Sequence, residues 1–327
     1  MSKRNENVSL SVLLASAVVA ILLAAQVNVK PAMAGDYTIG MQTKVRDIVQ
    51  RNRAVAPGLI RLAFHDCWVK GCDGSVLLER ADKQAEMDAP QNGGIRGLDL
   101  IQAIKDTLSL DDSTVTCADA VVYAAREACN VLSGGNIVYA VDGPGSHKDT
   151  NASSMADAGA LPGPTASFAN LAANFNGKGF TPRDVVVLSG AHAVGLAHRP
   201  NFEARLTANA NEISQKYRND VNVISNASPN KTAHNNVRDL DKAETEPGVL
   251  DNNYYAANLG KKVLFSSDFA LTTDGAALNN MTNFKNDATM WFRLFEDAMA
   301  RLSRLPAQGA DVLQVPRIKC NAPNPAS

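Results

Sequence analysis

Residues 59–78, LIRLAFHDCWVKGCDGSVLL, place an arginine, a histidine, two aspartates and two cysteines within one apolar run. Burying so many polar groups among leucine, valine and phenylalanine costs free energy unless each group has a partner. On a helix, Arg61 and His65 lie one turn apart, with Phe64 beside them. The neighbouring cation keeps the imidazole neutral near neutral pH, as a proton acceptor must be. The pattern indicates an acid–base site, although a capping histidine and a solvent-directed arginine are the alternative.

The second half of the same stretch combines hard oxygen ligands with a glycine-containing turn. Its two carboxylates and its hydroxyl belong to Asp66, Asp73 and Ser75. Together with exposed carbonyls, these are the ligands that Ca²⁺ takes in proteins. Cys67 and Cys72 are close enough in sequence to close the turn with a disulfide, if the backbone bends there. A solvated acidic turn is the alternative, but such a disulfide would make the turn rigid enough to bind an ion.

A second histidine, His192, lies in the apolar segment 184–198, DVVVLSGAHAVGLAH. The residues around it are small, so a large flat group could lie close against this segment. A flat cofactor ligated by the His192 ring would fit there. The alternative is a core histidine on a tightly packed helix.

Composition excludes some classes of function. The chain has 327 residues, 45% of them hydrophobic, and a formal charge of −1. That is normal for a globular protein and allows one large domain or two ordinary ones. Such a small net charge gives no global reason to expect a nucleic acid or an anionic membrane as a partner.

The N-terminus has the order of a secretory signal peptide, with a basic start, an apolar run over 10–25 and small residues ending at Ala34. We predict a signal peptide over 1–34 and an exported mature protein over 35–327. An uncleaved membrane anchor is the alternative, but the apolar run is rather short to span a bilayer. Export permits disulfides, and four glycosylation sequons are compatible with it.

Apolar residues recur three and four apart almost throughout, which predicts an all-α fold with little or no β-sheet. The segments with this spacing include 36–53, 97–110, 116–132, 166–179, 181–198 and 288–305. Thr181 and Pro182 are typical of a helix N-cap followed by proline at the first helical position. Two stretches, 141–165 and 222–248, are irregular, so we expect two helical groups with a cleft between them.

Four motifs in this order resemble the secretory plant-type haem peroxidases of class III. They are RLAFHDC at 61–67, GCDGS at 71–75, VTCADAVVYAARE at 115–127 and VVVLSGAHAVG at 185–195. The resemblance extends over residues 39–320. It implies a haem-peroxidase domain with a distal half over about 35–150 and a proximal half over about 151–320. It also implies haem b, hydrogen peroxide as oxidant and small aromatic donors, which we expect to be phenolic.

The resemblance assigns roles to the residues that face the cofactor. His192 corresponds to the proximal iron ligand, and Asp268 to the carboxylate that accepts the other N–H of its ring. His65 corresponds to the distal base, which takes a proton from peroxide and returns it to the departing oxygen. Arg61 corresponds to the cation that stabilises the developing charge, and Phe64 to a shield against bulky groups.

Further positions follow from the same resemblance. Asn92, with Glu86 behind it, corresponds to the pair that hydrogen-bonds the distal imidazole. This region is one residue short, which leaves Gln91 as a lesser candidate for the Asn92 position. Pro162 matches a proline at the substrate entrance.

The resemblance implies two calcium sites, and this sequence matches the family's ligands better at the distal site than at the proximal one. The distal ligands are Asp66, Val69, Gly71, Asp73 and Ser75. The proximal set is Ala193, Glu246, Val249 and Asp251. Ala193 replaces the usual threonine ligand and only Asp251 aligns cleanly, so we expect the second ion to be absent or weak.

The chain departs from the family in its cysteines. The family typically has four disulfides, and this chain can form two of them, Cys67–Cys72 and Cys117–Cys320. That leaves Cys129 as a buried hydrophobe inside a helix. Arg199 stands roughly where a missing cysteine is expected, and losing two bridges costs several kcal/mol unless packing compensates.

A further departure concerns the usual arginine partner of the carboxylate at position 119. The family pattern GRRD is replaced within VDGPGSHKD, 141–149. Lys148 is a candidate substitute as the partner of Asp119.

We therefore expect a monomeric, extracellular haem peroxidase, with the vacuole as an alternative location. An intracellular ascorbate-using peroxidase is disfavoured by the signal peptide and the paired cysteines. A secreted haem- or calcium-binding wall protein with weak turnover is the alternative from another class. A zinc hydrolase built on residues 65–67 fails because adjacent helical side chains point in different directions.

Overall fold

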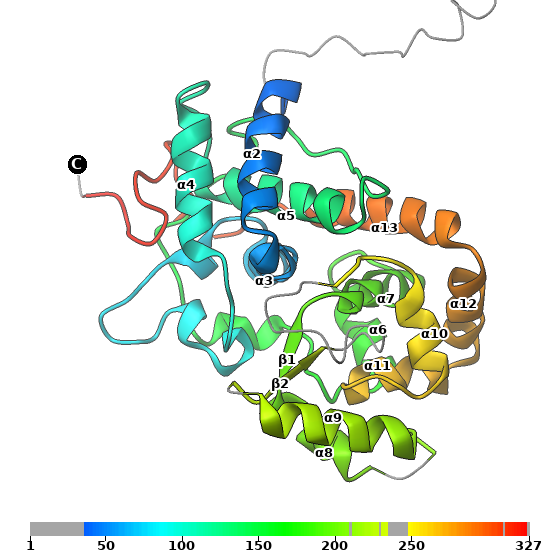
Figure 1. Cartoon of the computed structure of the whole chain (residues 1–327). Coiled ribbons are helices and arrows are strands. Elements are labelled where there is room, and N and C mark those ends of the chain that lie inside the picture. Colours follow the sequence, from blue (N-terminus) through cyan, green and yellow to red (C-terminus); the bar gives the residue numbers. More distant parts are fainter. Residues whose placement is uncertain (1–35, 209–210, 229, 235–247, 310, 326–327) are drawn as a thin grey trace, which may run out of the picture. The chain divides into compact units, whose positions relative to one another are not determined.

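Helix α3, Ala56–Lys70, contains the first half of the polar stretch and lies near the middle of the fold (Figure 1). It begins with Pro57 in its first turn, where proline's missing N–H leaves no bond unmade. It ends at Gly71, whose φ of 87° favours glycine. A Cβ at Gly71 would lie 1.9 Å from the Pro306 carbonyl oxygen, so the end of α3 approaches the C-terminal segment too closely for any side chain.

The computed structural model describes residues 36–208, 211–228, 230–234, 248–309 and 311–325. The signal peptide predicted over 1–34 lies outside them, as does Glu246. None of the helices in these ranges is long and apolar enough to cross a membrane.

Helix α5 is the buried scaffold against which α3 packs. It spans Cys117–Leu132, and all of its residues except Asn130 are buried. Thr116 and Asp119 form a capping box at its N-terminus, in which each side chain accepts a hydrogen bond from the backbone N–H of the other residue. The other helices of this group are α2 (Ile39–Arg51) and α4 (Leu98–Ser109). Both pack against α5.

A second group of helices follows the loop after α5 (Figure 1). It consists of α6 (Phe168–Asn176), α7 (Pro182–Ser189), α8 (Glu203–Leu206), α9 (Gln215–Ala227), α10 (Asn253–Leu259), α11 (Ser266–Ala270) and α12 (Gly275–Asn286). Helix α13, Ala288–Leu302, packs against α7, α12 and α3, so it contacts both groups.

The all-α prediction is confirmed over the described residues. Their one sheet is the short antiparallel pair β1 (Leu196–His198) and β2 (Thr232–His234). Ala197 pairs with Ala233 at its centre. Short 3-10 turns connect many of the helices.

The predicted helix over 181–198 is partly wrong. α7 begins at Pro182 with Thr181 as N-cap, as predicted, but it ends at Ser189. His192 lies in the 3-10 turn η6, Gly190–Ala193, and the chain then becomes extended at Val194. Apolar spacing continues past this point, but Val194 is already extended and Gly195 then takes a φ of 84°, so the chain does not return to a helix before β1.

The predicted irregular stretch 222–248 is also partly wrong. α9 continues to Ala227, because Ser214 caps it and the buried Tyr217, Val221 and Ser225 repeat at every fourth residue. The remainder includes β2, and residues 235–247 lie outside the described part.

Both predicted disulfides, Cys67–Cys72 and Cys117–Cys320, are formed, and Cys129 is a buried free thiol. The first closes the turn after α3. The second ties the start of α5 to the C-terminal segment.

Arg199 holds together the region where a family disulfide is missing. Its guanidinium donates to Ser225 Oγ, Asn226 Oδ1 and Asn222 Oδ1, each at 2.9 Å. Its backbone N–H donates to the Lys231 carbonyl at 2.8 Å. These bonds connect the end of β1 to α9 with hydrogen bonds instead of a covalent bridge.

The partner of Asp119 is His147 rather than the expected Lys148. His147 Nδ1 lies 2.7 Å from Asp119 Oδ1, and Nε2 lies 2.6 Å from the Ser303 carbonyl oxygen. A carbonyl accepts only, as does an ionised carboxylate, so both ring nitrogens carry protons in this arrangement. Burial lowers the pKa of His147, but the bond to Asp119 and its charge outweigh burial and raise it. This buried pair joins the start of α5 to the end of α13.

We predict that the His147–Asp119 pair makes stability depend on pH. The folded-state pKa of His147 lies above its ordinary 6.5. Its stabilisation is therefore complete below pH 6.5 and is lost as the pH rises through the folded-state pKa. His147→Gln should lower the free energy of unfolding by about 2 kcal/mol in mild acid and by less at alkaline pH.

Urea unfolding across a pH series measures this difference. His147→Arg carries a charge at every pH tested and serves as the matched control, so it should flatten the dependence. Parallel pH profiles for wild type and His147→Gln would contradict the prediction.

Candidate active site

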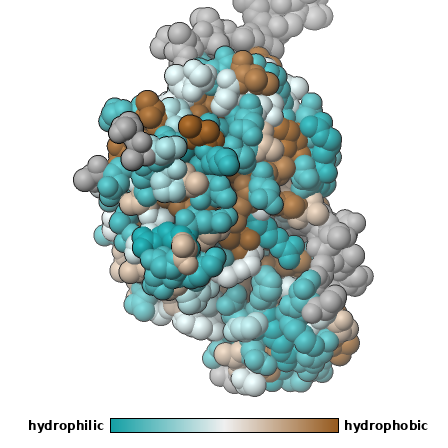
Figure 2. All heavy atoms as spheres, turned by 90° about the vertical axis from the view of Figure 1, so that its left-hand side faces the viewer, coloured by the Kyte–Doolittle hydropathy of each residue, from teal (hydrophilic) through white to brown (hydrophobic). Residues whose placement is uncertain are grey.

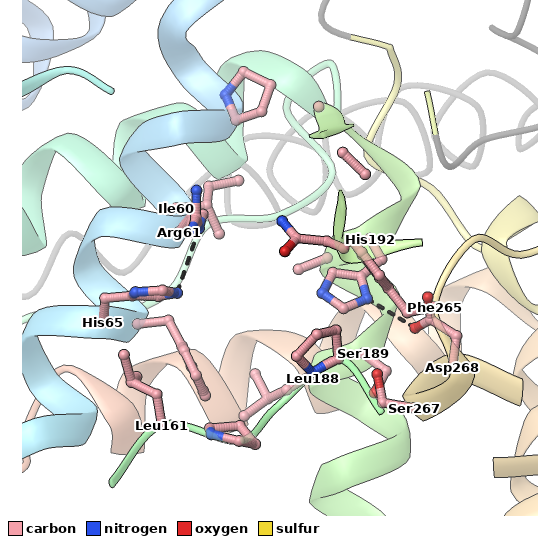
Figure 3. Close-up of a pocket in the computed structure, with 18 of the residues that line it drawn as sticks. Ile60, Arg61, His65, Leu161, Leu188, Ser189, His192, Phe265, Ser267 and Asp268 are labelled. Atoms are coloured by element: carbon pink, nitrogen blue, oxygen red, sulfur yellow. Dashed lines mark hydrogen bonds and ion pairs between the residues drawn. The ribbon is translucent and has the colours of Figure 1, made fainter. Parts of the chain in front are cut away.

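A cavity of about 360 Å³ separates the two helical groups. On one wall, α3 presents Arg61, Phe64 and His65. On the opposite wall, the end of α7 and η6 present His192 (Figure 3). Most of the lining between them is apolar and comes from Leu161, Pro162, Leu188, Ala191, Val194 and Phe265. Viewed from the side in Figure 2, apolar side chains gather near the middle of an otherwise largely hydrophilic face.

Hydrogen bonds fix the tautomer of His65. The Asn92 amide nitrogen donates to the Glu86 backbone carbonyl at 2.7 Å, so Asn92 Oδ1 faces the imidazole. His65 Nδ1 lies 2.5 Å from that oxygen and therefore carries the proton. Nε2 is then the basic atom, and it faces the cavity 3.4 Å from Arg61 Nε. The ring is poised to accept a proton from a molecule in the cavity.

The surroundings of His65 favour its neutral form. Burial, followed by the charge of Arg61, lowers its pKa to about 3, against the opposing bond to Asn92. Arg61 itself is held by the carbonyls of Gln91, at 2.9 Å, and Gly93, at 3.2 Å. The structure thus places Asn92 on the imidazole, whereas Gln91 contributes its backbone oxygen to Arg61.

The proximal wall has the opposite charge. His192 Nδ1 lies 2.8 Å from Asp268 Oδ1, and Asp268 is 1% exposed (Figure 3). The His192 side chain is 45% exposed, because its ring borders the cavity. Burial lowers the pKa of His192, but the charge and hydrogen bond of Asp268 outweigh it and raise the pKa. One imidazole therefore faces a cation and the other a carboxylate.

Close packing behind η6 positions His192. A Cβ at Gly190 would lie 2.6 Å from the Trp291 ring, so only glycine lets this turn rest on α13. Trp291 also donates its indole N–H to the Val187 carbonyl at 3.1 Å. The small residues noted around His192 thus serve two purposes: they admit α13 on one side and leave the cavity open on the other.

Sequence analysis missed two residues of the proximal wall. The Tyr254 hydroxyl donates to Asp268 Oδ1 at 2.7 Å, and Asn258 donates to the Asp268 backbone carbonyl at 2.7 Å. Both lie on α10, four residues apart. Their only signal in the sequence is the segment DNNYY at 251–255, of which the resemblance assigns a role to Asp251 alone.

The cavity suits a flat cofactor that needs one imidazole ligand. Its apolar walls match the faces of a haem macrocycle, and His192 presents a ring whose Nδ1 is already bonded to Asp268. Arg96, His198 and Asn201 supply polar side chains to the lining, suitable for the two haem carboxylates. The residues present therefore fit a haem.

A cluster of buried oxygens lies behind α3. Among the side-chain atoms of the described residues that are buried without a hydrogen-bond partner, four belong to this cluster: Asp66 Oδ1, Ser75 Oγ, Glu86 Oε1 and Glu86 Oε2. Burial raises the pKa of Asp66, and the charges of Asp73 and Glu86 raise it further. Burial also raises the pKa of Glu86 to about 8. Carboxylates gathered in this way are costly without a cation.

The distal calcium residues lie together around this cluster. Asp66 Oδ2 accepts the Gly74 N–H at 3.1 Å, and Asp73 Oδ1 accepts the Ser75 N–H at 2.9 Å. The Val69 carbonyl already accepts the Lys178 ammonium at 3.0 Å. No three His, Cys, Asp or Glu side chains in the described ranges converge as a metal cluster, so carbonyls and Ser75 must complete any site here.

The proximal calcium residues are less suitable. Ala193 has no side-chain oxygen and is fully buried, and the Val249 side chain is 40% exposed. The Asp251 carboxylate accepts hydrogen bonds from the backbone and the amide of Asn253. The absence or weakness of this second ion stays a prediction.

Comparison with known proteins gives a consistent result. A family model described as peroxidase matches residues 41–287. Peroxidase 30 of Arabidopsis thaliana is 33% identical over 267 residues, which cover 80% of each chain. Peroxidase 1 of Zea mays is 33% identical over 289 residues, covering 84% of this chain and 77% of the relative. Peroxidase 3 of Arabidopsis thaliana is 32% identical over 291 residues, 87% of each chain.

Proposed function

The chain belongs to the plant class III peroxidase family, and from this premise we propose that it is a secreted enzyme that reduces hydrogen peroxide and oxidises small phenolic donors. The observation that carries the proposal is the pair of imidazoles on opposite walls of one apolar cavity. His65 faces the cation Arg61, and His192 is bonded to the carboxylate of Asp268. A bound haem would supply the redox chemistry, accepting electrons from donors and delivering them to peroxide.

On the distal wall, the residues move and stabilise charge. His65 Nε2 accepts a proton from hydrogen peroxide and then delivers it to the oxygen that leaves as water. Asn92 holds the Nδ1–H of His65, so the ring keeps Nε2 directed into the cavity. Arg61 is anchored by two backbone carbonyls and stabilises the negative charge that develops as the O–O bond breaks.

On the proximal wall, His192 would hold the haem iron. Asp268 accepts a hydrogen bond from the Nδ1–H of His192 and fixes the orientation of the ring. The ring thereby gains partial imidazolate character, which makes it a stronger electron donor than a neutral imidazole. Pro162 lines the cavity, and we assign it to the entrance where small aromatic donors approach.

We propose that the enzyme acts outside the cell as a monomer, with the vacuole as the alternative location. The two disulfides support an oxidising compartment. The expected domain division, a signal peptide over 1–34 before a peroxidase domain over 35–327, belongs to the same proposal.

We predict that His65→Ala slows the reaction with peroxide by about 100-fold or more, because the proton acceptor is removed. The measurement is stopped-flow optical spectroscopy of the mature protein, refolded with haem and Ca²⁺, on mixing with hydrogen peroxide. An unchanged haem spectrum before mixing shows that the variant still binds the cofactor. Equal rates in wild type and variant would overturn the catalytic proposal in favour of a secreted haem-binding protein.

We also propose a Ca²⁺ ion at the distal cluster, held by Asp66, Asp73, Ser75 and the carbonyls of Val69 and Gly71. The support is the set of buried, unpartnered oxygens, whose mutual repulsion a divalent cation would relieve. Because Asp66 directly follows His65, the ion would hold the part of α3 that carries the distal base.

We predict that Ca²⁺ at about 100 times its Kd raises the melting temperature by about 5–10 °C, since binding to the folded state alone adds about 2.7 kcal/mol. Asp66→Asn should abolish this shift, whereas Asp251→Asn, at the proximal position, should retain it. Thermal unfolding in Ca²⁺ and in chelator measures both. A shift that is lost in Asp251→Asn and kept in Asp66→Asn would place the ion at the proximal position instead.

A further inference from the structure

Two donors converge on a single oxygen behind the proximal histidine. Asp268 Oδ1 accepts the Nδ1–H of His192 at 2.8 Å and the hydroxyl of Tyr254 at 2.7 Å. Tyr254 is 1% exposed, as is Asp268, so water does not compete strongly for this oxygen. The two bonds must share the charge of one carboxylate oxygen.

A third residue strengthens the tyrosine as a donor. The Asn258 amide nitrogen donates to the Tyr254 hydroxyl oxygen at 3.3 Å and to the Asp268 carbonyl at 2.7 Å. Accepting a hydrogen bond polarises the phenol O–H, so the chain from Asn258 through Tyr254 to Asp268 is cooperative. Asn258 is fully buried on α10, one turn after Tyr254, so the helix fixes the spacing.

The direction of the tyrosine bond is not ambiguous. An ionised carboxylate only accepts, so the phenol donates. Burial and the charge of Asp268 raise the pKa of Tyr254 well above its ordinary value, so the phenol stays protonated. The Tyr254 ring also packs edge-on to His192, with centroids 6.3 Å apart, which holds the hydroxyl in place.

We propose that Tyr254 is a positioning residue that limits the pull of Asp268 on the Nδ1 proton of His192. Because Asp268 Oδ1 also accepts the hydrogen bond of the phenol, it accepts the hydrogen bond of the imidazole N–H less strongly. The ring is then less imidazolate-like than a His–Asp pair alone would make it. This inference rests on the proposed function, in which His192 holds the haem iron, because the iron then senses the electron density of the ring.

Tyr254→Phe tests the proposal. Removing the hydroxyl should strengthen the His192–Asp268 bond and stabilise ferric over ferrous haem. The ratio of ferric to ferrous protein at a fixed potential should rise by about threefold to tenfold, since part of one charge-assisted hydrogen bond is transferred. The iron–histidine stretching frequency in the resonance Raman spectrum of the ferrous protein should rise as well.

Tyr255→Phe is the matched control. Its hydroxyl is equally buried on the same helix but donates to the backbone carbonyls of Val186 and Val187. It should leave the potential and the Raman band at their wild-type values. If both variants shift the potential equally, the effect is one of general packing and the proposal is overturned.

A second substitution keeps the proposal falsifiable if Tyr254→Phe does not fold. A fluorinated tyrosine with a more acidic phenol, incorporated at position 254, keeps the ring and donates more strongly. It should lower the ferric-to-ferrous ratio, opposite to the effect of phenylalanine, and an unchanged ratio would overturn the proposal. If wild type binds haem without any iron–histidine band, the proposed function fails as well. A normal band with no response to these changes overturns this inference alone.

Discussion

The apolar cavity can present two imidazoles only because a separate polar partner fixes each ring. Asn92 forms a hydrogen bond with Nδ1 of His65, and Asp268 forms one with Nδ1 of His192. The difference between the two sites lies in charge. Burial and the cation beside His65 lower its pKa, whereas the carboxylate behind His192 raises the pKa of that ring. Two residues of the same type thereby have opposite electrostatic surroundings within one cavity.

The polar groups that surround the cavity also join the helices that form it. α3 faces the cavity with Arg61 and His65 and turns Asp66 toward the buried oxygen cluster behind it. Any ion bound at that cluster would therefore lie next to His65, the neighbour of Asp66 in the chain. The His147–Asp119 pair likewise links α5 to α13. Helix α3 packs on α5, and Gly190 of η6, the turn that contains His192, rests on α13. Stability and site geometry thus depend on the same few buried charges.

Sequence reasoning was most successful where local pattern determines structure. The helical class, both disulfides and the start of α7 at Pro182 follow from spacing, resemblance and capping rules. It was wrong where the backbone leaves the helical region although apolar spacing continues, as at Val194 and Gly195. It was also silent on partners distant in sequence. Nothing in the pattern shows that Tyr254 contacts Asp268, or that His147 rather than its neighbour turns toward Asp119. Such contacts depend on how helices pack, which local periodicity does not encode.

Titration of haem into His192→Gly, with and without added imidazole, tests whether His192 binds haem iron in this cavity. We expect that wild type binds one haem, that the variant binds it about 10- to 100-fold more weakly, and that imidazole restores both the affinity and the histidine-ligated spectrum. The smaller side chain leaves room for the added ligand beside Asp268. Wild-type affinity and spectrum in His192→Gly, with no response to imidazole, would contradict the account.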